Sequence, residues 1–228
     1  MDGAFVAIEL SLWVLCALLV VLFVRSVRKY SISRSRAELM WGGGLALAAA
    51  AMAVEAMVFL GYVSSPLLQV YVFCSAAIVG VLSLGATRVL RSPRIESGYT
   101  AYIGATTVLV GLASALTPLP NAMVSGGIIS GNPPLLLLVL SSLVTGPATV
   151  VLLTASVVSL RRSRKWQTLL MIGGALILGA GGTLYIASFP VALYYAEFVG
   201  IVLLFFGLVS LPTAAPSKVS APGTVASH

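Results

Sequence analysis

Charged side chains are scarce in this sequence: they account for 8% of its 228 residues, whereas an ordinary soluble domain carries about 25%. Hydrophobic residues account for 59%, and the mean hydropathy is +1.08. A soluble domain could not cover its surface with so few charges. The composition therefore excludes soluble enzymes, disordered chains and small disulfide scaffolds, and it predicts an integral membrane protein.

Histidine and cysteine are nearly absent. The only histidine is His228, the last residue, and the two cysteines, Cys16 and Cys74, lie singly within apolar runs. Haem needs an axial ligand that is most often histidine, and zinc or copper sites depend on histidine or on clustered cysteine. We therefore expect no haem, no histidine-based metal site and no disulfide framework.

Residues that carry catalysis or hold larger cofactors are missing as well. The three lysines, Lys29, Lys165 and Lys218, all lie outside the apolar runs, so a retinal Schiff base would have no anchor. The sequence has no phosphate-binding glycine loop, because its glycine clusters lie inside apolar runs, and it has no catalytic serine or cysteine dyad. It therefore predicts a protein that is not an enzyme and carries no cofactor.

Seven apolar stretches are each long enough to cross a membrane, which takes about 20 mainly apolar residues in a helix. We therefore predict an all-α, polytopic membrane protein with seven transmembrane helices in one bundle over residues 1–211. The remaining residues, 212–228, are rich in Ala, Pro, Ser and Thr, which is typical of a flexible tail. The predicted spans are 4–24, 39–62, 67–87, 99–117, 134–160, 167–188 and 191–211.

All thirteen lysines and arginines fall on one side of this predicted arrangement. They lie in the connections after the first, third and fifth spans and in the tail, and none lies in the N-terminal segment or in the other three connections. The positive-inside rule makes the basic side cytoplasmic. We therefore predict a multi-pass protein of the cell membrane with its N-terminus outside and its C-terminus in the cytoplasm. This placement also explains the net charge of +7 without a nucleic-acid partner.

Spans one to three resemble spans five to seven, which indicates an internal repeat. Both triplets carry Arg-Ser-Arg in their first connection, at 34–36 and 162–164, and a tryptophan follows each, Trp41 and Trp166. Parallel repeats joined by a linking span are a known transporter layout. The alternative is chance similarity, because tryptophan at the interface and arginine inside are general features of membrane proteins.

The three-plus-one-plus-three plan resembles that of sugar-efflux and PQ-loop carriers, and the number and orientation of the spans resemble those of seven-helix rhodopsins. The resemblance ends at topology. The sequence has no Pro-Gln pair and no lysine within a span, so we assign it to neither family.

Three glutamates lie within predicted spans, where a charge costs about 2.5–3.5 kcal/mol on insertion scales. At about 1.5 Å per residue, all three lie roughly 22–28 Å from the cytoplasmic side, in the outer third of a hydrocarbon layer about 30 Å thick. We predict an outward-facing polar pocket at this height. Its predicted residues are Glu9, Glu55, Glu197, Gln69, Tyr185 and Tyr195.

Clustered carboxylates suit a hard cation through oxygen ligands, or proton exchange, because burial and like charges favour the neutral form. Glu55 is the strongest single candidate because it follows an almost continuous run of alanine and glycine. The alternative is that Glu9 reaches the outer surface while Glu55 and Glu197 each bond a neighbouring helix.

Gly146 and Pro147 lie near the middle of the fifth span, and we predict a helix kink there because proline removes one helical hydrogen bond. Discontinuous helices often mark transporter sites, but a passive kink healed by a side chain or water is the alternative. The connection over 118–133 is uncharged and glycine-rich. It is expected to fold over the outer mouth, to enter the interface or to contact a partner.

Two functions follow from these observations. The first is a non-catalytic accessory or receptor-type subunit of a membrane complex, which has the lipid bilayer and other protein chains, or further copies of itself, as partners. The scarcity of polar groups in the inner half favours it, because a transport path needs hydration or ligands all the way across. The alternative is a small carrier or channel that binds a proton or a small cation at the outer carboxylates.

Overall fold

The computed structural model describes residues 3–87, 93–125, 127–129, 133–163, 166–186 and 190–209. This part of the chain is almost entirely helical, with seven α-helices, one short 3-10 helix and a minimal hairpin. The helices are α1 (Gly3–Ser33), α2 (Arg36–Phe59), α3 (Ser65–Ala86), α4 (Pro93–Leu116), α5 (Leu135–Ser163), α6 (Trp166–Ile186) and α7 (Pro190–Val209). Between α4 and α5 lie the 3-10 helix η2 (Asn121–Met123) and the strands β1 (Val124–Ser125) and β2 (Ile128–Ile129).

Each of the seven predicted apolar stretches is a helix in the structure, so the prediction of an all-helical chain is confirmed. The first helix differs from its prediction, because it continues beyond residue 24 to Ser33. Arginine and lysine are good helix formers, so a helix does not have to end where its apolar residues end. Only Arg34 and Ser35 separate α1 from α2, and Arg34 adopts a left-handed conformation with φ of 50°.

Five helices within the described residues are long and apolar enough to cross a membrane. The stretch Trp166–Leu178 of α6 is also apolar but shorter. These lengths agree with a membrane protein, as the composition predicts. The five candidate spans are Glu9–Ser33, Arg36–Phe59, Ser65–Ala86, Pro93–Leu116 and Leu135–Ala155.

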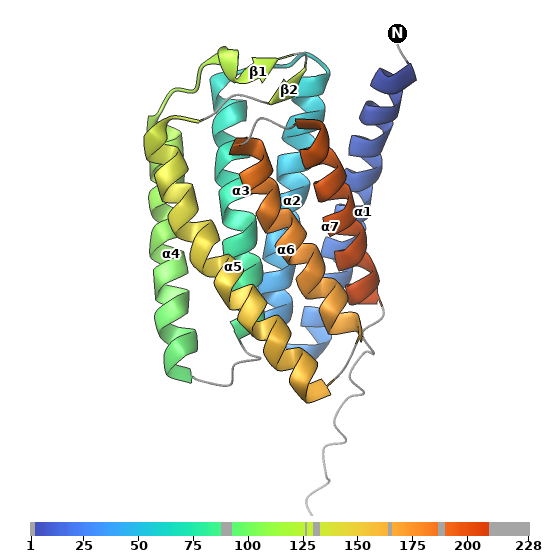
Figure 1. Ribbon diagram of the computed structural model, residues 1–228, viewed down its shortest axis with the longest axis vertical. Helices are drawn as coiled ribbons and strands as arrows, with labels where there is room; N and C mark the ends of the chain where they lie inside the picture. Colours follow the sequence, from blue (N-terminus) through green and yellow to red (C-terminus); the bar gives the residue numbers. More distant parts are fainter. Residues whose placement is uncertain are drawn as a thin grey trace, which may run out of the picture.

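The helices run alternately up and down the long axis of the molecule (Figure 1). The hairpin of β1 and β2 lies at the end where the chain begins, and we call this the hairpin end. The last turns of α1, α3 and α5 and the first turns of α2, α4 and α6 lie at the opposite end. We call this the basic end, because Arg28, Lys29, Arg94 and Arg161 lie in the helix termini that meet there.

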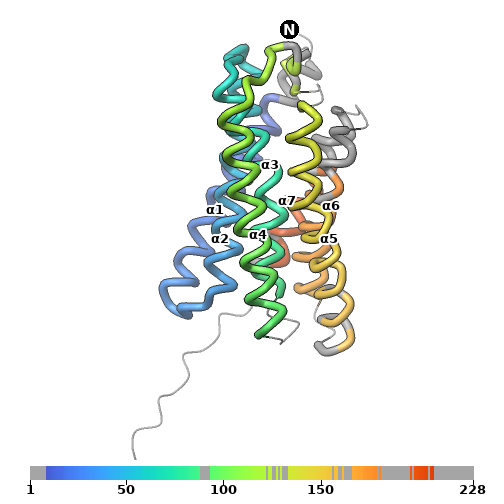
Figure 2. Tube along the Cα trace, turned by 90° about the vertical axis from the view of Figure 1, so that its left-hand side faces the viewer, coloured from blue at the N-terminus to red at the C-terminus, as the bar shows by residue number. Residues whose placement is uncertain are grey.

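Helix α3 lies at the centre of the arrangement. It packs against α2, α4, α5 and α6, whereas α1 packs against α2 and α7. Figure 2 shows α1 and α2 on one side and α5 and α6 on the other, with α3 and α4 between them. A cluster of buried leucines, which includes Leu19, Leu45, Leu82, Leu152 and Leu204, fills the space between these helices.

The tightest helix contact joins α6 and α7 through glycine. A Cβ atom built on Gly174 would lie 2.5 Å from the carbonyl oxygen of Gly200, and one built on Gly200 would lie 3.1 Å from the carbonyl oxygen of Gly174. Small residues let two helix backbones approach closely in a membrane, where lipid is as apolar as leucine and packing must hold helices together. Gly174 and Gly200 therefore serve helix packing at this contact.

Two adjacent glycines of α6 provide a matched test of this contact. Gly174→Ala is expected to destabilise the fold by about 1–3 kcal/mol, because the methyl group overlaps backbone atoms of α7. Gly173→Ala is the control: the nearest atom to its Cβ, on Leu203, is 4.0 Å away, so the change is expected to be neutral or to stabilise by up to about 1 kcal/mol through helix propensity. The measurement is the free energy of unfolding in mixed micelles. Equal effects of the two changes would contradict the close contact.

Candidate functional site

The carboxyl group of Glu55 is the most unusual group in the described interior. Glu55 lies on α2, one helical turn before the helix ends at Phe59, and its residue is only 3% exposed. The hydroxyl of Tyr71 on α3 donates a hydrogen bond of 2.6 Å to Oε1. The other oxygen, Oε2, is buried and has no hydrogen-bond partner in the described structure. Such groups are rare in native proteins and call for an explanation.

Tyr71, the partner of Glu55, belongs to a cluster of buried apolar residues from α2, α3, α5 and the connection between α4 and α5. We call the described residues 119–125 and 127–129 of this connection the hairpin cover. Its buried apolar side chains belong to the same cluster as residues of α2 on either side of Glu55. The buried cluster includes Ala51, Val54 and Val58 from α2, Leu68 and Val72 from α3, and Leu119, Met123 and Ile129 from the hairpin cover.

Polar contacts fasten the end of α4 and the start of the hairpin cover to α3. Ser65 Oγ accepts a hydrogen bond of 2.9 Å from the backbone N–H of Leu119. Gln69 Nε2 donates one of 2.9 Å to the carbonyl oxygen of Thr117. Gly127, with φ of 79°, lies against the backbone of Phe59, and a Cβ there would be 3.6 Å from the Phe59 carbonyl oxygen. The described part of the connection therefore packs onto α2 and α3.

The predicted six-residue pocket is only partly described. Glu9 is half-buried on α1, while the side chains of Tyr185, Tyr195 and Glu197, on α6 and α7, lie outside the described residues. The side-chain amide of Gln69 donates to the carbonyl oxygen of Thr117, just after α4 ends. Because Gln69 and Tyr71 are two positions apart on α3, their side chains leave the helix on different faces. The convergence of the three glutamates stays a prediction. No three His, Cys, Asp or Glu residues gather within the described ranges.

Tyr71 is absent from the predicted pocket, although the structure makes it the partner of Glu55. Its position along the chain contains a hint, because Glu55 lies just before the turn between α2 and α3 and Tyr71 lies just after it. Two residues at similar distances from a tight turn stand at similar heights on antiparallel helices. The position along the chain does not show which face of each helix is turned inward, so the pairing needs the structure.

Near Gly146 and Pro147, where a helix kink is predicted, a side chain of α4 bonds to the backbone of α5. Pro147 lies inside α5 and has no N–H to donate to the carbonyl oxygen of Leu143, one turn earlier. The hydroxyl of Tyr102 donates a hydrogen bond of 2.7 Å to that same oxygen. Gly146 is exposed, and a Cβ there would meet nothing within 4 Å. The freed carbonyl is thus satisfied by a neighbouring helix, which agrees with a passive site healed by a side chain.

Further hydroxyl groups line the buried face of α4. Ser83 on α3 and Tyr99 on α4 share a hydrogen bond of 2.6 Å near the basic end. Thr107 Oγ1 and Ser114 Oγ are buried and have no partner in the described structure. These groups are separated by apolar residues such as Ile103 and Val110, so they form isolated polar points on this face.

A double-mutant cycle tests the Glu55–Tyr71 pair. Tyr71→Phe is expected to cost about 1–2 kcal/mol of unfolding free energy, because it leaves a buried carboxyl group without its donor. In a Glu55→Met background the same change is expected to cost much less, since no acceptor remains. Tyr62→Phe is the control: Tyr62 is 69% exposed, and its change is expected to stay within about 0.5 kcal/mol. An equal cost of Tyr71→Phe in both backgrounds would contradict the pair.

Comparison of the chain with protein-family models, with curated proteins and with solved structures finds no match.

Proposed function

We propose that this protein is a non-catalytic, seven-span protein of the cell membrane that acts as an accessory or receptor-type subunit. In this proposal the hairpin end faces outward and the basic end faces the cytoplasm. The described helix termini support this orientation, because their cations gather at one end of the bundle. The positive-inside rule assigns such an end to the cytoplasm.

The apolar interior on the basic side of Glu55 is the observation that carries the proposal. From Glu55 toward the basic end, the buried face of α2 presents Met52, Ala48, Leu45 and Trp41. Leucines from α1, α3, α5 and α7 pack against this face. A transport path must offer water or polar ligands along its whole length. The described core therefore favours a carboxyl group that is closed off from the basic end over a carboxyl group that lines a transport path.

The proposal includes an internal repeat, in which α1–α3 correspond to α5–α7. Consecutive helices pack in both triplets, since α2 contacts α1 and α3, and α6 contacts α5 and α7. This shared neighbour order supports a parallel repeat with α4 as the linking helix. A receptor-type subunit built in this way would bind its partners through faces that otherwise contact lipid.

A carrier or channel is the second candidate, and one observation favours it. Glu55 Oε2 is buried and lacks a partner among the described residues, as an acceptor for a proton or a small cation would in its unloaded state. Thr107 and Ser114 add two unpaired hydroxyl groups on α4. In this alternative the carboxyl group exchanges its ligand as the hairpin cover moves.

Flux measurements separate the two candidates. The purified full chain is reconstituted into vesicles with imposed proton, sodium and potassium gradients, and internal pH and cation content are followed. Since the described part of the core is apolar between Glu55 and the basic end, flux is expected to equal that of protein-free vesicles. Flux that is lost in Glu55→Gln and kept in the control Glu96→Gln, a change in the first turn of α4 and outside the predicted pocket, would establish the carrier and contradict the subunit.

The subunit role is tested by native mass spectrometry of the chain extracted from its own membrane. We expect a defined assembly in which this chain has a fixed stoichiometry with a second, different chain. A stable monomer, or an oligomer that holds only copies of this chain, would contradict the proposal.

A further inference from the structure

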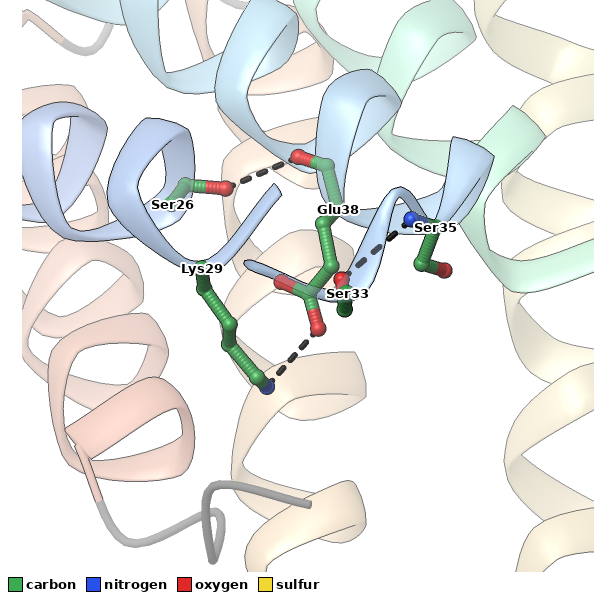
Figure 3. A network of polar contacts seen from close by, with 5 residues as sticks. All are labelled: Ser26, Lys29, Ser33, Ser35 and Glu38. Carbon is green, nitrogen blue, oxygen red and sulfur yellow. Dashed lines mark hydrogen bonds and ion pairs between the residues drawn. The ribbon is translucent and has the colours of Figure 1, made fainter. Parts of the chain in front are cut away.

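The turn between α1 and α2 is fixed by a network of polar contacts at the basic end (Figure 3). Lys29 Nζ lies 2.7 Å from Glu38 Oε1, and Ser26 Oγ donates a hydrogen bond of 2.8 Å to the carbonyl oxygen of Glu38. The backbone N–H of Ser35 donates one of 3.2 Å to Ser33 Oγ. These contacts hold the last turns of α1 against the first turn of α2.

The ion pair leaves an excess of positive charge at this turn. Glu38 is the acidic residue in the first turn of α2, and Lys29 already occupies it. Arg28, Arg34 and Arg36 are exposed and form no ion pair within the described part of the chain. We call these three arginines the basic corner. Three guanidinium groups without a counter-charge attract an anion.

Exposed apolar side chains lie beside the basic corner. Val24 and Val27 are each 42% exposed, Leu39 is 45% exposed and Ile32 is 70% exposed. Apolar side chains that alternate with arginine in this way are typical of the boundary between lipid tails and headgroups. A soluble phosphate compound would leave these apolar side chains in water, whereas a lipid covers them.

We propose that the basic corner is a binding site for the phosphate headgroup of an anionic phospholipid. Guanidinium groups bind phosphate oxygens through paired, charge-assisted hydrogen bonds, and the acyl chains of the same lipid cover the apolar side chains around Val27 and Ile32. The network of Lys29 and Glu38 holds the turn in place before the lipid arrives. This site is independent of Glu55 and of the proposed role as a subunit.

The test uses the full chain in nanodiscs that contain phosphatidylglycerol and phosphatidylcholine, with bound lipids counted by native mass spectrometry. Each of Arg28→Gln, Arg34→Gln and Arg36→Gln is expected to lower the preference for phosphatidylglycerol about fivefold. Circular dichroism and gel filtration verify that the variants are folded.

Arg161→Gln is the matched control, because Arg161 is an exposed arginine at the same end of the bundle on α5. It is expected to change the preference less than twofold, since a general surface field is screened within roughly 10 Å. Equal losses for Arg161→Gln and for the arginines of the basic corner would overturn the proposal, as would a preference unaffected by any of the substitutions. Competition by free glycerol phosphate as strong as that by the lipid would assign the site to a soluble anion and would also overturn it.

Discussion

Lipid tails offer no hydrogen bonds, so a chain that spans a membrane has to satisfy its polar groups from within. Many polar groups of the described helices follow this constraint, although the buried hydroxyl groups of Thr107 and Ser114 have no partner among the described residues. Hydroxyl groups such as that of Thr149 return to a carbonyl oxygen one turn earlier on their own helix. Where Pro147 frees a carbonyl oxygen, Tyr102 from the neighbouring helix supplies the missing donor. Where α4 ends, the amide of Gln69 bonds to the carbonyl oxygen of Thr117.

Glu55 stands out against this pattern because only half of its carboxyl group is satisfied. Burial removes water from the second oxygen, and apolar side chains of the hairpin cover share a buried cluster with those of α2 and α3. The leucine-rich core lies on the basic side of Glu55. A carboxyl group in an apolar interior costs free energy, so its presence there calls for a role. Its hydrogen bond to Tyr71, which joins α2 to α3, accounts for it without a path across the membrane.

The length and apolar character of the runs were sufficient to predict all seven helices, because a span needs little more than about 20 apolar residues. They could not predict the end of α1, since Arg28 and Lys29 extend the helix without adding apolar length. Strands of two residues, such as β1 and β2, are too short to leave a periodic pattern. The importance of Glu55 was visible in the sequence as a charge inside an apolar run. Its bond to Tyr71 was not, because facing side chains depend on how α2 and α3 rotate against each other.

The central claim is a bundle with a cytoplasmic basic end and a carboxyl group sealed from both sides. Single cysteines at positions 55, 125 and 163, with Cys16 and Cys74 replaced by alanine, test it directly with a membrane-impermeant thiol reagent. The account predicts that Ser125→Cys reacts on intact cells, that Ser163→Cys reacts only after permeabilisation, and that Glu55→Cys reacts in neither condition. Reaction of Glu55→Cys from the side that labels Ser163→Cys, or a reversed pattern at positions 125 and 163, would contradict it.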